Sequence, residues 1–318
     1  MYTPLVVSFF GRSTQEIINS PEVEIPYLCD TILPIGSTVL MSGEAGAGKS
    51  IMALNLAYCL ALGHDFFGHA VSASVPVYYL NLEQPSPQFD KRVKQVVKAL
   101  GAEEARVQVH TELSPDFPGC LGNIIEAVRK LQPKVIIIDT LVKLACNYDE
   151  NRAGDMAKFF NVLSKVRADP DVVLIILHHM NKSAFVDGAR VQSSYRVRGS
   201  SAILAAVDNC FSIEKQAENK HCLAAVKLRD APNMASLDFS INADYTISPV
   251  TPINIAANTV ARVHETVRLA GSAGITPKTL VTTLKLSESS VHRGLRDGQV
   301  RGVLVSSDGV WRAKNNCG

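Results

Sequence analysis

This sequence lacks the features that mark membrane-spanning and secreted proteins, repeat proteins and proteins that bind metal through cysteines. No uninterrupted apolar run reaches the ~18 residues of a membrane-spanning helix, and the N-terminus shows no basic region followed by an apolar run and a small-residue cleavage site. The seven cysteines form no C-x-x-C pair and no metal-ligand spacing, so we expect buried or incidental thiols in a reducing compartment. There is no internal repeat and no low-complexity segment. These absences predict a soluble, cytoplasmic protein without a membrane partner.

The chain also has little net charge, +2 over 318 residues, which by itself does not suggest a nucleic-acid partner. The charge is unevenly spread, however. From Ile255 to the C-terminus there are nine Lys and Arg against four Asp and Glu, a net of +5, which leaves −3 for the rest. A basic tail on a mildly acidic body fits a body that binds nucleotide and a tail that touches a phosphate backbone.

What the sequence does contain is a phosphate-binding loop of the pattern G-x-x-x-x-G-K-[ST]. The apolar segment 37–42 before the loop predicts a strand, and the spacing of 51–58 predicts a buried helix. Glycines let backbone N–H groups turn inward around a phosphate, and the helix adds its positive N-terminal end. The residues expected to bind ATP, or GTP, are Gly43, Glu44, Ala45, Gly46, Ala47, Gly48, Lys49, Ser50 and Ile51. Lys49 would reach the β- and γ-phosphates, and Ser50 would hold Mg²⁺.

The segment from Val39 to about Ile213 alternates strands and helices, which predicts an α/β fold with a parallel sheet and right-handed crossovers. Further strands are expected at 75–83, 106–110, 134–139 and 171–179, and helices at 86–100, 122–131 and 154–167. From about Asp208 the pattern changes to alternating strands at 209–213, 222–227 and 236–248, which predicts a mixed edge. We expect an ATPase domain over 1–250, with 1–36 as a lead-in, and a second domain over 251–318.

Two carboxylates at the ends of predicted strands complete a hydrolytic site. Asp139 ends an apolar strand, the usual place for an acid that supports Mg²⁺ through Ser50 or water, although an ordinary strand-terminal Asp is the alternative. Glu83 ends another strand, where a carboxylate facing the γ-phosphate could orient or deprotonate the attacking water. The alternative for Glu83 is a helix-capping or surface residue.

The order of these motifs resembles that of the RecA-like ATPases, and within them the DnaB-type and small plasmid-type hexameric replicative helicases. The resemblance covers about 25–235 and depends on the order of the loop, Glu83, Asp139, the run His178-His179-Met180-Asn181-Lys182 and the run Arg198-Gly199-Ser200-Ser201-Ala202. It implies that Glu83 is the catalytic glutamate and that His179 senses the γ-phosphate. Since side chains alternate along a strand, only one of His178 and His179 can face the nucleotide, and the sequence leaves open which.

Lys227-Leu228-Arg229 follows a predicted strand, and residues two apart on a strand point the same way. In the enzymes that this chain resembles, a K-x-R at this place reaches across the subunit interface as a cationic finger. The resemblance therefore implies that Lys227 and Arg229 act on a neighbour's nucleotide, which would couple hydrolysis to assembly of a homo-oligomer, expected to be a hexamer. A solvated basic edge strand is the alternative.

DNA is expected to contact the chain in two places. The loop 183–198 carries Arg190, Tyr195 and Arg196, a mixture of cations and an aromatic that suits single-stranded nucleic acid. The tail, about 254–314, reads as three helices and a hairpin, the order of a winged helix-turn-helix. Its third helix places His292, Arg293 and Arg296 on one face, which could enter a major groove. The alternatives are an ordinary surface loop for the first and a protein-docking module for the second.

Taken together, the sequence predicts an ATP-hydrolysing, Mg²⁺-dependent DNA motor, a replicative helicase of plasmid or phage type. Two other functions remain open. The chain could be an ATP-gated DNA-binding regulator or loader, or a recombination or repair ATPase that forms filaments.

Overall fold

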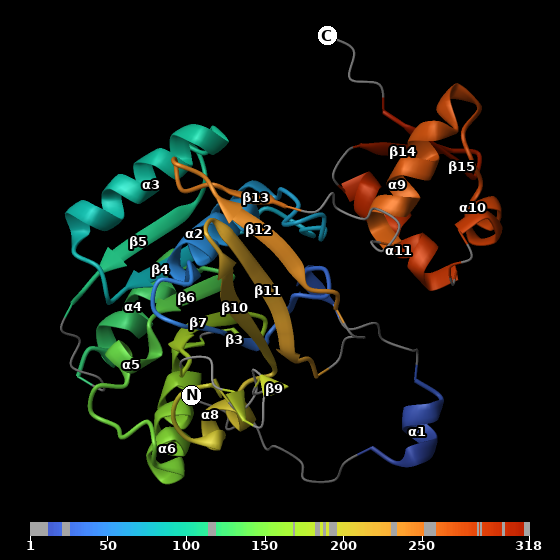
Figure 1. Cartoon of the computed structure of the whole chain (residues 1–318). Coiled ribbons are helices and arrows are strands. Elements are labelled where there is room, and N and C mark those ends of the chain that lie inside the picture. The colour runs from blue at the N-terminus through green and yellow to red at the C-terminus, as the bar shows by residue number, and fades with distance from the viewer. Residues whose placement is uncertain are drawn as a thin grey trace.

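The computed structural model describes residues 12–20, 26–113, 119–167, 169–181, 196–229, 234–250, 259–284, 286, 288–300 and 303–314, and the backbone of 185–186 and 189–190. The body of the protein is an α/β unit around a nine-stranded sheet of order β13-β12-β11-β10-β3-β7-β6-β4-β5 (Figure 1). None of the helices in the described ranges combines the length and apolar character that crossing a membrane requires.

The parallel part of the sheet comprises six strands, of which the four central ones are almost entirely buried and the edge strand has no buried residue. The six strands are β3 (Thr38–Gly43), β4 (Val77–Asn81), β5 (Val107–Thr111), β6 (Val135–Asp139), β7 (Val173–His179) and β10 (Asn209–Ala217). β7 lies between β3 and β6, so the strands that end at Gly43 and Asp139 are separated by one strand. The predicted α/β fold with a parallel sheet is confirmed.

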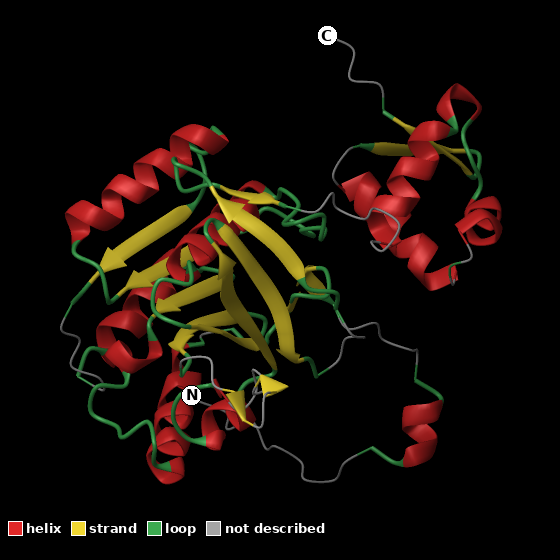
Figure 2. Ribbon diagram, in the orientation of Figure 1, coloured by secondary structure: helices red, strands yellow, loops and turns green. Residues whose placement is uncertain are grey.

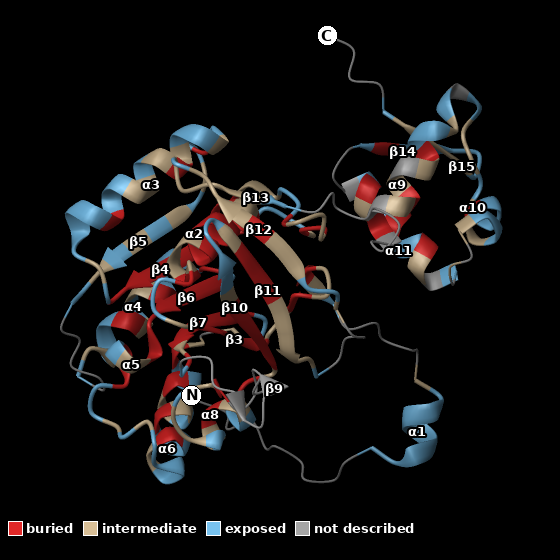
Figure 3. Ribbon diagram, viewed as in Figure 1, coloured by how far each residue is buried: buried red, intermediate tan, exposed pale blue. Residues whose placement is uncertain are grey.

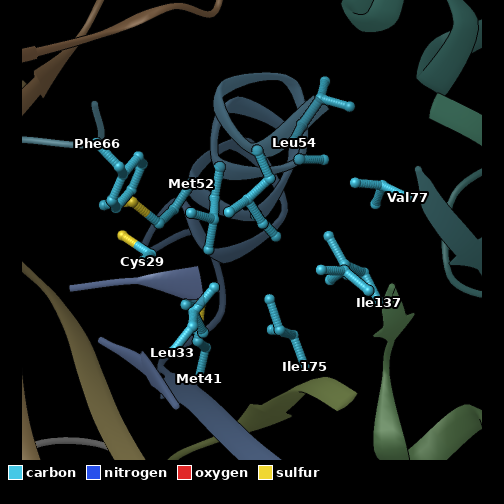
Figure 4. Close-up of a cluster of buried hydrophobic side chains, with 14 of the residues drawn as sticks. Cys29, Leu33, Met41, Met52, Leu54, Phe66, Val77, Ile137 and Ile175 are labelled. Atoms are coloured by element: carbon cyan, nitrogen blue, oxygen red, sulfur yellow. The ribbon is translucent and has the colours of Figure 1, made fainter. Parts of the chain in front are cut away.

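Both faces of this sheet are covered, because successive residues of its strands enter different hydrophobic cores. Met41, Ile137 and Ile175 pack under α2 (Lys49–Leu62) and α3 (Ser86–Leu100), whereas Leu40, Ile136 and Ile176 belong to the core on the other face. Figure 4 shows part of the first core. The second face is covered by α4 (Leu121–Leu131), α5 (Leu141–Leu144), α6 (Ala153–Leu163), its continuation η1 (Ser164–Val166), and α8 (Ser201–Ala206). Two-sided burial explains why the sequences of the four central strands, β3, β7, β6 and β4, are almost continuously apolar instead of alternating (Figure 3).

Three antiparallel strands extend the sheet beyond β10. They are β11 (Lys220–Lys227), β12 (Leu237–Ile241) and β13 (Ile247–Pro249). The prediction of one strand over 236–248 is wrong, because Asn242–Thr246 forms a turn, held by an Asp244 carboxylate that accepts from both the backbone N–H and the hydroxyl of Thr246. This extension is fastened to α2, where Asn55 Nδ2 donates to Tyr245 O at 2.8 Å and Asn55 Oδ1 accepts from Ile247 N at 3.3 Å.

Part of the expected lead-in belongs to the body. β1 (Tyr27–Cys29) and β2 (Leu33–Pro34) form a small hairpin, and Leu28, Ile32 and Leu33 are buried in the first core. The short helix α1 (Thr14–Ile18) has no buried residue. Two further short strands, β8 (Phe185–Val186) and β9 (Ala189–Arg190), pair within the loop after β7 (Figure 2).

The tail has a hydrophobic core of its own, formed by Val263, Val267, Leu280, Val291, Leu295 and Leu304. Its elements are α9 (Thr259–Leu269), η2 (Gly271–Ala273), α10 (Pro277–Leu284), α11 (Glu288–Val300), β14 (Leu304–Ser307) and β15 (Val310–Ala313). The element order is the three helices and a hairpin expected from the sequence. The domain boundary predicted at 250/251 adjoins 251–258, which lie outside the described residues, and it remains a prediction.

Two glycines of α11 permit close packing of the tail. A Cβ on Gly298 would lie 2.4 Å from Leu304 Cδ1 and 2.9 Å from His264 Nε2, and one on Gly294 would lie 2.8 Å from Val263 Cβ. We expect Gly298→Val to destabilise the tail by about 1–3 kcal/mol, because the added side chain overpacks this contact. Trp311, the only tryptophan of the chain, packs on the same core. Its fluorescence during denaturant unfolding therefore measures the loss.

Gly122→Ala in α4 is the matched control, since a Cβ there meets nothing within 4 Å. It should leave the Trp311 transition unchanged. An unaltered Trp311 midpoint in Gly298→Val would show that α11 and β14 do not pack in this way.

Candidate nucleotide-binding site

The phosphate loop leaves β3 at Gly43 and enters α2 at Lys49. Gly46 and Gly48 have φ of 76° and 91°, in the left-handed region that glycine adopts without strain, and such a turn lets successive N–H groups line an anion site. A Cβ on Gly43 would lie 2.5 Å from Ile213 O, and one on Gly48 would lie 2.8 Å from Ile241 Cδ1. The loop is thus closely held by β10 and β12, and only glycine fits at both positions.

A cavity of about 400 Å³ lies against this loop. It is lined by Glu44, Ala45, Gly46 and Ala47 on one side and by the end of β10, Glu214–Ala217, on the other. The nine residues expected to bind nucleotide, 43–51, therefore form one continuous loop and helix start beside an open space.

Lys49 is buried in the loop, with a relative exposure of 6%. Its ammonium donates to Gly43 O and Glu44 O, both at 3.0 Å. Burial lowers the pKa of Lys49, while the nearby Glu83 and Asp139 carboxylates oppose the shift. A phosphate would replace carbonyl oxygens with a charged partner, which is the favourable exchange for a desolvated ammonium.

Asp139 ends β6 as expected and is completely buried. Tyr79 Oη donates to its Oδ2 at 2.9 Å, and Oδ1 has no partner of good hydrogen-bond geometry among the described residues. Burial raises the pKa of Asp139 to about 6, and hydrogen bonds from Ser50 and Tyr79 act against this rise. A buried carboxylate with an uncommitted oxygen beside the Ser50 hydroxyl suits Mg²⁺, which prefers oxygen ligands and supplies the charge that the site lacks.

His179 and Glu83 approach the loop from the ends of β7 and β4, two strands that flank β6. His179 Nδ1 lies 3.5 Å from the Lys49 ammonium, and His179 Nε2 lies 3.8 Å from Glu83 Oε2. Burial and the Lys49 charge lower the pKa of His179. Glu83 lies two residues beyond the end of β4 and its side chain is 38% exposed, so its carboxylate is accessible to water.

His178 faces the other side of the sheet and is fully buried. Its Nε2–H donates to Arg198 O at 2.7 Å, and burial lowers its pKa to about 4. Of the two histidines that the sequence left open, His179 is thus the one beside the phosphate loop, and His178 supports the backbone that returns to the strand end at Arg198.

Arg196 occupies a different place from the one expected. Its side chain is 2% exposed, and its guanidinium forms ion pairs with Glu44 at 2.5 Å and with Glu214 at 2.9 Å. The prediction that Arg196 contacts nucleic acid is therefore corrected, because protein carboxylates enclose the cation. The side chains of Arg190 and Tyr195 lie outside the described residues.

Lys227 and Arg229 lie beside the amino ends of the parallel strands, whereas the phosphate loop lies at their carboxyl ends. Lys227 pairs with Cys210 near the start of β10, and Asp208, the ion-pair partner of Arg229 at 2.8 Å, accepts a hydrogen bond from Thr38 N at the start of β3. Lys227 Nζ donates to Leu204 O and Val207 O at the end of α8, and burial lowers its pKa. Within one chain these two cations are distant from the site built around Lys49.

In the tail, His292, Arg293 and Arg296 are exposed on α11 as the helical spacing predicted.

Sequence reasoning missed other residues that shape the nucleotide site. Tyr79 and Glu214 are examples, because nothing in a strand sequence reveals that Tyr79 meets Asp139 60 positions away, or that Glu214 meets Arg196 18 positions away across a loop. His221 was also missed; it packs on Phe239 and its Nδ1 lies 3.1 Å from Ala47 O in the loop.

The fold and this site define a P-loop ATPase with a RecA-like core. The family model described as AAA domain, AAA_25, matches residues 12–184, and the chain belongs to this family. It is similar to the DNA repair protein RadA of Campylobacter jejuni, 27% identical over 159 residues, 49% of this chain and 31% of that protein. The RadA of Chlamydia pneumoniae is 26% identical over 215 residues, 66% of this chain and 40% of that protein.

The matches therefore span well under half the length of these curated relatives. Among solved structures, a KaiC-like protein from Pyrococcus horikoshii OT3 is 16% identical, with a TM-score of 0.48, over 70% of this chain and 94% of that one.

The low pKa of His178 predicts an acid sensitivity. Because the folded pKa is about 4 and the ordinary value is 6.5, the unfolded state binds the proton more readily, and stability present above pH 6.5 is lost as the pH falls toward 4. We expect wild type to lose up to about 3 kcal/mol more than His178→Gln over this interval. Denaturant unfolding followed by far-ultraviolet circular dichroism measures the difference.

His110→Gln on the exposed face of β5 is the control and should follow the wild-type curve. Parallel curves for wild type and His178→Gln across this pH range would contradict the burial of a neutral imidazole.

Proposed function

We propose that this ATPase is a DNA motor that hydrolyses ATP as a homo-oligomer, in the manner of a ring-forming, hexameric replicative helicase. One observation carries the proposal. Lys49, Glu83, Asp139 and His179 converge on the phosphate loop, whereas the cationic pair expected to complete such a site lies beside the amino ends of the parallel strands.

Within the site, each side chain has a task set by its position. Lys49 binds the β- and γ-phosphates, and Ser50 and Asp139 hold Mg²⁺, which neutralises charge on the phosphates when bound. Glu83, accessible to water, orients the attacking molecule and accepts its proton. His179 lies between Lys49 and Glu83 and so responds to the presence of a γ-phosphate.

A second copy of the chain supplies the missing cation. The Arg229 side chain is 55% exposed in the single chain and pairs with Asp208 at 2.8 Å, and Lys227 lies nearby. Facing a neighbour's triphosphate, these cations would stabilise charge that develops in the transition state. Hydrolysis is then fast only where two copies meet.

The polymer is DNA. The tail carries a net charge of +5, and its exposed His292, Arg293 and Arg296 share one helical face of α11. That face is suited to a major groove, with the β14–β15 hairpin as the wing of a winged helix-turn-helix.

A specific observation favours a second function, a recombination or repair ATPase. The two curated relatives described above are both named DNA repair protein RadA. An ATP-gated regulator or loader that binds a DNA sequence without unwinding remains the third alternative.

The deciding experiment measures ATP hydrolysis with and without single-stranded DNA, together with unwinding of a forked duplex. Stimulated hydrolysis with unwinding supports the helicase. Stimulation without unwinding, with open helical filaments in electron micrographs, supports the repair function. A rate of hydrolysis that DNA does not change contradicts the motor. If the protein also gives a sequence-selective footprint that deletion of 254–318 abolishes, the result supports the regulator.

Two substitutions separate binding from chemistry. Lys49→Ala should abolish nucleotide binding, because no other cation is placed for the phosphates among the described residues of the loop. Glu83→Gln should bind nucleotide normally and lose about 10²–10⁴-fold in kcat, since the amide accepts no proton. Titration with a fluorescent nucleotide and a phosphate-release assay measure the two effects, and normal turnover in Glu83→Gln would remove Glu83 from its role.

Catalysis across an interface predicts complementation. Arg229→Ala should bind nucleotide and lose about 10³-fold or more in hydrolysis. Mixed with Glu83→Gln, it should recover part of the activity, because some interfaces then combine an intact Glu83 with an intact Arg229. Steady-state hydrolysis at varied mixing ratios is the measurement, with Arg312→Ala in the tail as the control for loss of a surface cation. No recovery at any ratio would contradict a finger that acts in trans.

A further inference from the structure

Arg196 connects three parts of the nucleotide-binding region. Its Nη2 bonds to Glu44 in the phosphate loop at 2.5 Å and to Asn181 O after β7 at 3.3 Å, and its Nη1 bonds to Glu214 in β10 at 2.9 Å. The guanidinium is 2% exposed, in contrast to the Glu44 side chain at 38% and the Glu214 side chain at 13%. One buried cation thus has one carboxylate partner on the loop and another on a strand of the sheet.

The backbone around Arg196 is fixed independently of its side chain. We name Arg196–Arg198 the return segment, because it runs back along the end of β7. Asn181 N donates to Arg196 O at 2.8 Å, Arg198 N donates to His179 O at 3.2 Å, and Met180 and Val197 form an antiparallel bridge. The return segment therefore moves with the strand end that carries His179.

The far end of the return segment is held as well. His178 Nε2 donates to Arg198 O at 2.7 Å, and the Arg198 guanidinium pairs with Glu150 at 2.6 Å in the loop before α6. Ser200 N also donates to Glu150 O at 2.7 Å, and Ser200 is the N-cap residue of α8. The return segment is therefore connected both to the end of β7 and, through Glu150, to the loop that precedes α6. A displacement of the return segment would move both.

The charge of Glu44 explains why this cation is needed. A carboxylate inside a loop that must accept a polyphosphate repels the ligand unless a nearby cation compensates it. Arg196 provides compensation from a buried position, with Glu214 of β10 as its second carboxylate partner.

We propose that Arg196 is a positioning residue with two effects. It compensates Glu44 so that the phosphate loop accepts a nucleoside triphosphate, and through Glu44 it links that loop to the return segment, so that nucleotide occupancy changes the segment. The proposal relies on the proposed function only in that a nucleotide binds at 43–51, and it requires no DNA.

The first test is a crosswise pair of double substitutions, with nucleotide affinity and thermal stability measured for each. Arg196→Met should weaken ATP-analogue binding about tenfold, the effect of about 1.4 kcal/mol of added repulsion between Glu44 and the polyphosphate. Adding Glu44→Gln should restore most of the affinity, because the repelling carboxylate is gone. Adding Glu214→Gln instead should restore thermal stability without restoring affinity, because that carboxylate lies on the sheet.

Equal recovery of affinity by the two second substitutions, or recovery by neither, would overturn the proposal and leave Arg196 a purely structural residue. Arg196→Lys, which keeps the charge but cannot form the two-sided contact, should bind the analogue with an affinity between those of wild type and Arg196→Met.

The second test needs no change at Arg196 and remains decisive if Arg196→Met does not fold. Hydrogen exchange of the amides of Asn181 and Arg198 is measured with and without ATP analogue. Nucleotide should alter their protection in wild type and in Glu214→Gln, and should leave it unaltered in Glu44→Gln. An unchanged response in Glu44→Gln would overturn the link. If the wild-type protein binds nucleotide and shows this change in protection, but DNA does not change its ATP hydrolysis, the proposed motor function is refuted and this inference stands.

Discussion

The parallel pairing of β3, β7 and β6 is the constraint on which the nucleotide site depends. In this register Gly43 lies opposite His179, and Asp139 lies opposite Leu177, so the loop, His179 and the buried acid meet at the carboxyl ends of the parallel strands. β4 adds Glu83 at the same end of the sheet. Hydrophobic cores on both faces hold these strands, and the polar chemistry is confined to the places where the strands end.

Much of this arrangement is predictable from the sequence, because the signals are local. A glycine-rich loop between an apolar run and a helical pattern defines its own structure, and Asp139 ends its strand as expected. The strand alternation even limited the histidines to one candidate facing the nucleotide, although the hydrogen bond from His178 to Arg198 was needed to identify His179. The three helices and hairpin of the tail were recognisable because caps and turn residues mark each end.

The remainder depends on contacts between residues far apart in the chain. Arg196 looked like a polymer contact because it lies in a long loop near Tyr195, but its partners Glu44 and Glu214 are set by the order of strands in the sheet. In the same way, the segment 236–248 had enough β-forming residues for one strand, and only the hydrogen bonds of the Asn242–Thr246 turn reveal two. A sequence pattern reports which side chains are polar, whereas the fold decides whether a polar side chain finds a protein partner or the solvent.

The hydrogen bonds of Asn55 give the chain a short mechanical connection. The polypeptide that leads to the tail departs from β13, where Ile247 N and Tyr245 O are both bonded to Asn55 in α2. α2 is the helix that begins at Lys49, less than two turns before Asn55. A pulling force on the tail would load the pairing of β13 with β12 first, through Val250 N on Asp238 O, and the hydrogen bonds of Asn55 would then transmit it to α2.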